Sequence, residues 1–152
     1  MDPSRAASNF QDPSTRPVVI WRFSDVYLLA AEAAFKLSDL PNAASLINVV
    51  RQRAAYRKTN TAAQNTAAAA AMVIQPSDVT LDFILDERSR EFFAECQRWL
   101  DLVRTRQLTR RVQLWNNEAT TYVKDEFMLR AIPQNEIDLV TEGPKMQQNP
   151  GY

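Results

Sequence analysis

Apolar residues recur at helical spacing in three stretches of this chain. Residues 22–37 and 41–56 carry apolar side chains three and four positions apart, which predicts two helices. Because a short polar turn joins them and Asp39 can cap the second, we expect an antiparallel hairpin. The third stretch, 80–104, would supply a second helix pair, and we expect its first part, as far as residue 95, to pack on that hairpin.

The first of these helices is apolar around most of its circumference, which is typical of a helix buried between others. Glu32 and Lys36 lie one turn apart and can form an ion pair. The alanines between residues 30 and 34 would let a partner helix approach closely. We expect the packed face of this helix to consist of Phe23, Val26, Tyr27, Ala30, Ala34 and Leu37.

Charged residues interrupt the apolar side of the third predicted helix. Arg88 and Glu95 fall in the middle of that side, and Glu87 and Glu91 continue the row at one-turn spacing. A charge in apolar surroundings is costly unless it is paired. Two interpretations therefore stay open. One is a structural ion-pair network, in which Arg88 is buried and bonded to Glu32, Glu91 or Glu95.

The other interpretation is a catalytic pair of carboxylates, Glu87 and Glu91, of the kind that cleaves glycosidic bonds. The arginines of the same run, Arg88, Arg98 and Arg104, favour the structural network. Their positive charge would keep the carboxylates ionised, whereas a general acid needs a raised pKa. We expect the remaining arginine pairs, at 51 and 53 and at 110 and 111, to be solvated or paired.

The other segments have weaker patterns. Residues 1–21 are polar at first and contain prolines, which predicts an irregular lead-in. The alanine-rich segment 57–78 predicts a mobile loop, because no apolar face supports a helix there. We expect residues 122–132 to be irregular and 133–140 to form a helical turn. At the end of the chain, Pro150 and Gly151 suit the central positions of a type II turn.

Composition excludes several classes of function. The 152 residues suffice for one domain, and 18 basic against 18 acidic residues argue against a nucleic-acid binder. No apolar run approaches the ~20 residues that span a bilayer. The chain has no histidine and one cysteine, so histidine-based catalysis and His or Cys metal clusters are excluded. With two glycines, a phosphate-binding loop is excluded too, and we expect no metal and no cofactor.

Four blocks of sequence, in order, resemble the C-terminal part of the RagB/SusD family. They are residues 22–33, 47–54, 87–104 and 132–152, and the third reads ERSREFFAECQRWLDLVR. Cys96 stands where the family usually has glycine, so the chain there can differ in detail. The matching residues that we take as the structural signature are Glu32, Arg51, Arg53, Glu87, Arg88, Glu91, Glu95, Arg98, Trp99, Asp101, Pro133, Glu136, Asn149, Pro150, Gly151 and Tyr152.

This resemblance implies an all-α fold of tetratricopeptide-like antiparallel helix pairs with an irregular C-terminal segment, here over residues 22–152. It implies a lipid-anchored, non-catalytic protein on the outer surface of the outer membrane. Such a protein binds a glycan or another nutrient together with a SusC-type TonB-dependent transporter. Family members are longer and their ligand loops lie mostly upstream. We therefore expect this chain to be a C-terminal fragment, without the signal and the anchor, that binds oligosaccharides weakly or not at all.

Two aromatic residues are weak candidates for ligand binding. A sugar could stack on Trp115 if its ring is exposed, and on Tyr122 less well, although a tryptophan is more often a core residue. We expect Trp99 and Cys96 to be buried and Trp21 to pack where the first helix begins. The rival to nutrient binding is a tetratricopeptide-type scaffold that holds a peptide or protein in a concave polar groove.

Overall fold

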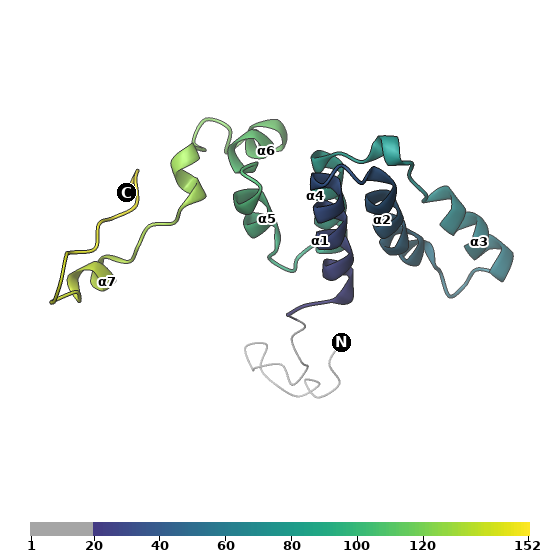
Figure 1. Cartoon of the computed structure of the whole chain (residues 1–152), viewed down its shortest axis with the longest axis horizontal. Coiled ribbons are helices and arrows are strands. Elements are labelled where there is room, and N and C mark those ends of the chain that lie inside the picture. Colours follow the sequence, from purple (N-terminus) through teal and green to yellow (C-terminus); the bar gives the residue numbers. More distant parts are fainter. Residues whose placement is uncertain (1–19) are drawn as a thin grey trace, which may run out of the picture. The chain divides into compact units, whose positions relative to one another are not determined.

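The computed structural model describes residues 20–152, and every regular element within them is helical (Figure 1). The predicted all-α class is therefore confirmed. The chain forms two compact units, Met1–Glu87 and Arg88–Tyr152. The boundary between the units falls inside α4 (Leu81–Glu91). Most of the predicted lead-in lies outside the described residues, so the division at residues 21 and 22 stays a prediction.

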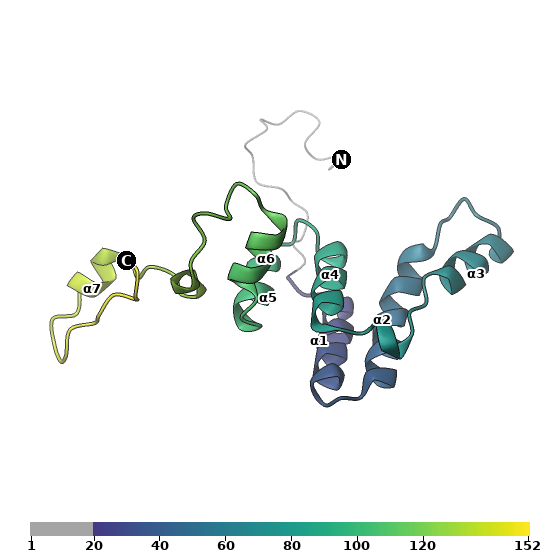
Figure 2. The same cartoon turned by 90° about the horizontal axis from the view of Figure 1, so that it is seen from above.

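The first unit begins with the predicted helical hairpin. Helices α1 (Phe23–Lys36) and α2 (Leu40–Ala55) lie side by side and run in opposite directions (Figures 1 and 2). Asp39 caps α2, since its Oδ1 accepts a hydrogen bond of 3.2 Å from the Asn42 backbone N–H. The expected pair of Lys36 with Glu32 is also present, at 2.8 Å. Both helices match the predicted ranges to within one residue at each end.

The packed face of α1 differs from the predicted one. Of the six residues expected there, Ala34 is buried and Tyr27 half-buried, whereas the other four are exposed. The side chains that α1 does bury are Asp25, Leu28, Ala31, Glu32 and Ala34. Because α1 is apolar on nearly every side, its periodicity left the direction of the core undecided. Packing turned its two carboxylates inward and much of its apolar surface outward.

Three helices contribute to the core of the first unit. The largest fully buried side chains are Leu28 from α1, Ile47 from α2 and Ile84 and Leu85 from α4. Full burial of each such side chain stabilises the fold by roughly 1.5–3 kcal/mol. Ala31, Ala43 and Ala44 are buried beside them, which is how the alanine-rich helices approach closely. The expected packing of the hairpin with the first part of the third stretch is thus present.

The predicted loop at residues 57–78 is wrong in part, because it contains α3 (Ala62–Ala71) and the short 3-10 helix η2 (Pro76–Asp78). A capping box starts α3: the Thr61 hydroxyl accepts from the Gln64 N–H, and the Gln64 side chain accepts from the Thr61 N–H. Alanine has the best helix propensity, so a capped alanine run needs no apolar face. No residue of α3 is buried, and the mobility of this segment stays a prediction.

The stretch 80–104 forms two helices. After α4 the chain turns, and α5 (Arg98–Arg104) begins seven residues later. Ala94 and Cys96 in this turn have φ of 65° and 60°, left-handed values that end a helix. The family resemblance places a glycine at position 96, which suits such a backbone. Two expectations fail in this stretch: Cys96 is exposed, and Trp99 is 40% exposed rather than core.

The second unit continues with α6 (Leu108–Trp115), the 3-10 helix η3 (Asp125–Met128) and α7 (Gln134–Asp138). Its buried apolar side chains are Phe92, Leu102 and Leu108. The predicted helical turn at 133–140 is confirmed by α7, and the irregular segment before it contains η3. None of the helices among residues 20–152 is both long enough and apolar enough to cross a bilayer.

Candidate functional site

In the first unit, the signature residues bind backbone and neighbouring side chains. Arg51 on α2 donates from Nε to the Met72 carbonyl at 2.8 Å and from Nη1 to Glu87 Oε2 at 2.7 Å. Its guanidinium also lies 5.6 Å from the centre of the Phe83 ring. Arg51 therefore joins α2 to α4 and to the segment that precedes η2. Glu87, one of the two candidate catalytic carboxylates, is buried and serves as a structural ion-pair partner.

Next to Arg51, Asn48 holds the same segment. Its Nδ2 donates to the Ile74 carbonyl at 3.0 Å, and its Oδ1 accepts from the Ile74 N–H at 2.9 Å. This pair of bonds satisfies a backbone donor and acceptor much as a neighbouring strand would. The second block of the family resemblance, residues 47–54, thus includes two side chains that tie residues 72–74 to α2.

In the second unit, Arg88 and Asp101 form a buried ion pair. Each is 2% exposed, and Arg88 Nε donates to Asp101 Oδ2 at 2.7 Å. Arg104 binds the other oxygen of that carboxylate, with Nη2 2.9 Å from Oδ1. Arg88 also lies over the Phe92 ring, 5.0 Å from its centre. The expected burial of Arg88 against a carboxylate is confirmed, and the described bond comes from Asp101, which was not among the expected partners.

A hollow of about 330 Å³ lies beside this pair, where α4 ends and α5 begins. Partial burial lowers the pKa of the Arg98 guanidinium there, and the nearby Asp101 carboxylate acts against that shift. Asp101 is the one acidic residue among those that line the hollow, which are Arg88, Ser89, Phe92, Phe93, Ala94, Cys96, Gln97, Arg98 and Asp101. Two carboxylates on either side of a scissile bond are therefore not available in this hollow.

The other candidate carboxylates are less buried than Glu87. Glu91 is half-buried at the end of α4, and Glu95 is exposed in the turn that follows. A second hollow, of about 230 Å³, lies between α1 and α2, and it is lined by Arg22, Phe23, Ser24, Tyr27, Val49, Val50 and Arg53. No acidic residue lines it. Among residues 20–152, no cluster of three or more acidic or cysteine side chains could hold a metal ion.

The two aromatic candidates are both on the surface. Trp115, at the end of α6, and Tyr122 are each 74% exposed. Trp115 is therefore a surface residue, although a tryptophan is more often found in the core. Neither lines either hollow. Trp99 is covered on one face by Arg130, whose guanidinium lies 5.5 Å from the ring centre. Trp21 is 71% exposed and does not pack closely where α1 begins.

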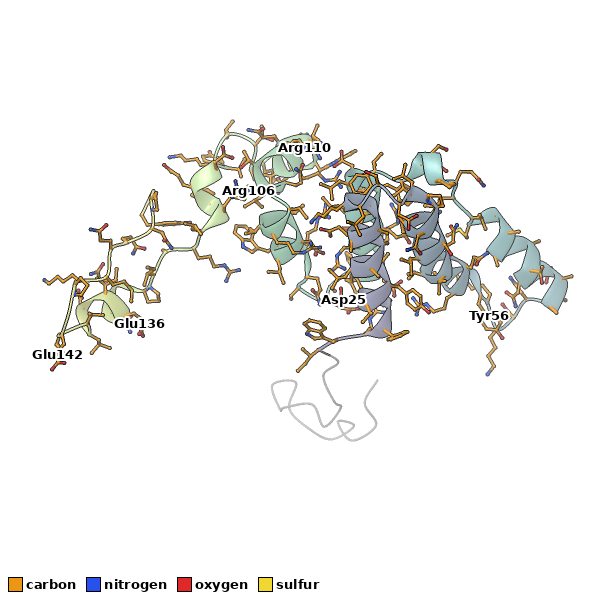
Figure 3. All side chains as sticks on the ribbon, viewed as in Figure 1. Asp25, Tyr56, Arg106, Arg110, Glu136 and Glu142 are labelled. Carbon is orange, nitrogen blue, oxygen red and sulfur yellow. The ribbon has the colours of Figure 1, made fainter. Side chains whose placement is uncertain are left out.

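A polar clasp closes the C-terminal segment. Gln148 bonds both backbone groups of Ile132, accepting from its N–H and donating to its carbonyl, each at 2.8 Å. Asn149 Nδ2 donates to the Arg130 carbonyl at 2.7 Å, and the Tyr152 hydroxyl donates to that of Leu129 at 3.1 Å. These contacts, from residues 148–152 to residues 129–132, are the clasp. The loop that it closes carries α7 and the exposed Glu136 and Glu142 (Figure 3).

The turn at the end of the clasp matches the expectation. Gly151 has φ of 90°, the value that the second central residue of a type II turn requires. A Cβ at this position would lie 2.6 Å from Glu126 Oε2 and 2.9 Å from Glu126 Cβ. Both the backbone and the space around it therefore call for glycine. The motif at the extreme C-terminus is explained by structure rather than by ligand binding.

Sequence reasoning missed the burial of several charged residues, among them Asp25 and Arg111. Asp25 at the beginning of α1, labelled in Figure 3, is 4% exposed, and Arg111 on α6 is equally buried. Asp25 belongs to a matching block, which could have marked it. Arg111 had been expected to be solvated or paired, and it stands next to the exposed Arg110. Its position one turn after Leu108, which is buried on the same helix, is the signal that could have shown its burial.

Together, the helix pairs, the buried arginine–carboxylate pairs and the C-terminal clasp form an all-helical scaffold. The sequence model of the SusD family matches residues 5–152, and the chain belongs to that family. A SusD-like protein from Formosa agariphila is 35% identical over 88 residues, which are 58% of this chain and 17% of that protein. The match thus spans less than a fifth of the relative's length.

Proposed function

We propose that this chain is part of a nutrient-binding component of an outer-membrane uptake system, and that its partner is a SusC-type TonB-dependent transporter. The observation that carries the proposal is the match to the SusD family over residues 5–152. The nutrient class that we favour is a glycan. The location is the outer surface of the outer membrane, where a lipid anchor holds the protein.

We infer that the protein does not catalyse a reaction. The support comes from the environment of two buried carboxylates, those of Glu87 and Asp101. Glu87 is bonded to Arg51, and Asp101 is bonded to two arginines, Arg88 and Arg104. Each of these carboxylates is therefore held as an ion-pair partner within the helical scaffold.

Co-purification tests the partner. The complete gene would be expressed with an affinity tag on residues 1–152, together with a SusC-type transporter of the same organism. After detergent extraction we expect the transporter to be recovered with the tagged protein. An unrelated TonB-dependent receptor from that organism serves as the control. Equal recovery of both, or of neither, would contradict the proposed partnership.

A further inference from the structure

The hollow beside the Arg88–Asp101 pair has a buried floor and an exposed rim. Every residue that lines it belongs to the second unit. Arg88, Phe92 and Asp101 are buried and form the floor, whereas Phe93, which is 84% exposed, and the exposed Cys96 stand at the rim. Its volume of about 330 Å³ falls at the lower end of the ~300–1,000 Å³ that small-molecule sites occupy. The hollow is therefore accessible from solvent and large enough for a small ligand.

The charges in this hollow favour an anion. Its lining holds two guanidinium groups, those of Arg88 and Arg98, and the single carboxylate of Asp101. Both oxygens of that carboxylate are already bonded, one to Arg88 at 2.7 Å and the other to Arg104 at 2.9 Å. Partial burial lowers the pKa of the Arg98 guanidinium, and a second negative charge beside it would favour its ionised form.

Rings and neutral polar groups complete the lining. The buried Phe92 and the exposed Phe93 offer apolar surface on which a ligand can pack. Gln97, which is half-buried, and Ser89, which is exposed, add an amide and a hydroxyl that can donate hydrogen bonds. Guanidinium groups next to aromatic rings suit a ligand that carries its negative charge on an apolar body.

We propose that this hollow binds a small organic acid, which consists of one carboxylate on an apolar body about the size of a single ring. The carboxylate accepts hydrogen bonds from the Arg98 guanidinium, whose planar fork matches a carboxylate bidentately. The body packs against Phe92 and Phe93. A volume at the lower end of the usual range suits one ring better than an oligosaccharide. The proposal goes beyond the function proposed above and depends on neither the glycan nor the transporter.

Three probe compounds test the chemistry of this site. 3-Phenylpropionate has the charge and the ring, 3-phenylpropionamide has the same shape without the charge, and glucuronate has the charge on a polar ring. Their binding is measured from the NMR shift of the Arg98 Nε–H in the isotope-labelled 152-residue chain. We expect phenylpropionate to bind with a dissociation constant of about 1 mM and the other two at least about tenfold more weakly. Equal binding of either comparison compound, or no saturable shift with phenylpropionate below about 10 mM, would overturn the proposal.

Two variants test the residues of the site. Arg98→Gln should weaken phenylpropionate binding by about tenfold or more, since it removes the charged donor. Phe93→Ala should weaken it by about threefold and, because this ring is exposed, should leave the unfolding midpoint unchanged. The second variant therefore tests the site even where the first does not fold. Arg90→Gln and Tyr122→Ala, at exposed positions outside the hollow, are the matched controls. Unchanged binding in Phe93→Ala, or equal weakening in the controls, would overturn the proposal.

The thiol at the rim gives an independent measure of occupancy. Cys96 is the sole cysteine of the chain, and it lines the hollow. Saturating phenylpropionate should slow its alkylation by the neutral reagent iodoacetamide by about threefold or more. Mass spectrometry follows the peptide that contains Cys96, in the 152-residue chain and in the polypeptide that the complete gene encodes. An unchanged rate in both would overturn the proposal. So would protection confined to the 152-residue chain, because another segment would then fill the hollow in the longer polypeptide.

Discussion

At the scale of single residues, the informative feature is charge buried with a partner. The sequence placed Arg88 on an apolar side and so predicted a buried, bonded guanidinium. Its described partner, Asp101, lies 13 positions later, on the far side of the turn between α4 and α5. Spacing along one helix identifies neighbours one turn apart, whereas a contact across a turn depends on where the helix ends.

Replacing Arg88 by methionine should destabilise the protein by about 3 kcal/mol, the lower end of the range for breaking a buried ion pair. The lower end applies because Asp101 keeps its bond to Arg104. The free energy of unfolding would be measured by urea titration. Arg90→Met, an exposed change on the same helix, is the matched control and should stay within about 0.5 kcal/mol of the parent. Equal effects of the two changes would show that the Arg88–Asp101 pair is not structurally important.

At the scale of elements, side chains that bond the backbone decide where segments begin, end and attach. Thr61 and Gln64 start α3, Asn48 holds residue 74, and Gln148 holds residue 132. Each satisfies backbone groups that a helix end or an irregular segment leaves open. The bonds of Gln148 to the backbone explain how the irregular C-terminal segment stays attached to the residues before α7.

Gly151→Ala should loosen the clasp. Alanine at φ of 90° costs about 1–2 kcal/mol, and its Cβ would collide with Glu126. The Ile132 N–H donates a hydrogen bond to Gln148 Oε1, and its hydrogen exchange should accelerate tenfold or more. Gly143→Ala is the matched control, since Gly143 also has a positive φ but open space around it. Faster exchange at Ile132 in both variants would mean that backbone strain alone, without the clasp, controls this region.

At the scale of the whole molecule, the two aromatic candidates lie on the surface. Trp115 and Tyr122 are exposed, and neither lines the hollow between α1 and α2 or the hollow beside the Arg88–Asp101 pair. Sugar binding by a protein usually combines ring stacking with several placed hydrogen bonds inside a concave site. The match to the Formosa agariphila relative covers less than a fifth of that protein.

The isolated chain should therefore bind oligosaccharides with a dissociation constant no tighter than about 1 mM, or not at all. Calorimetry against a panel of glycans measures this, with Trp115→Ala as the comparison. Product analysis of the same mixtures should show no released sugar. Tight binding that disappears in Trp115→Ala would show that a sugar-binding site lies at the end of α6. Sugar release that is lost in Glu91→Gln would contradict the non-enzymatic assignment.

The sequence by itself determined the helical hairpin, the buried arginine and the terminal turn, because each depends on short-range rules. Periodic apolar residues, a capping Asp39 and a Pro–Gly pair act within a few positions of each other. The family followed from four such blocks in order. The same local reasoning failed at α3, because the prediction gave the missing apolar face more weight than the capping box and the alanine run.

Only the tertiary structure decided which side of α1 faces the core, which carboxylate Arg88 binds and which tryptophans are exposed. In each case, the local sequence is compatible with more than one arrangement. An apolar helix can bury any side, and Trp99 is core or surface according to whether Ala94 and Cys96 adopt left-handed backbone. The choice rests on the partners that burial brings together, such as Arg88 with Asp101, because an unpaired charge in the core would cost more than an exposed ring.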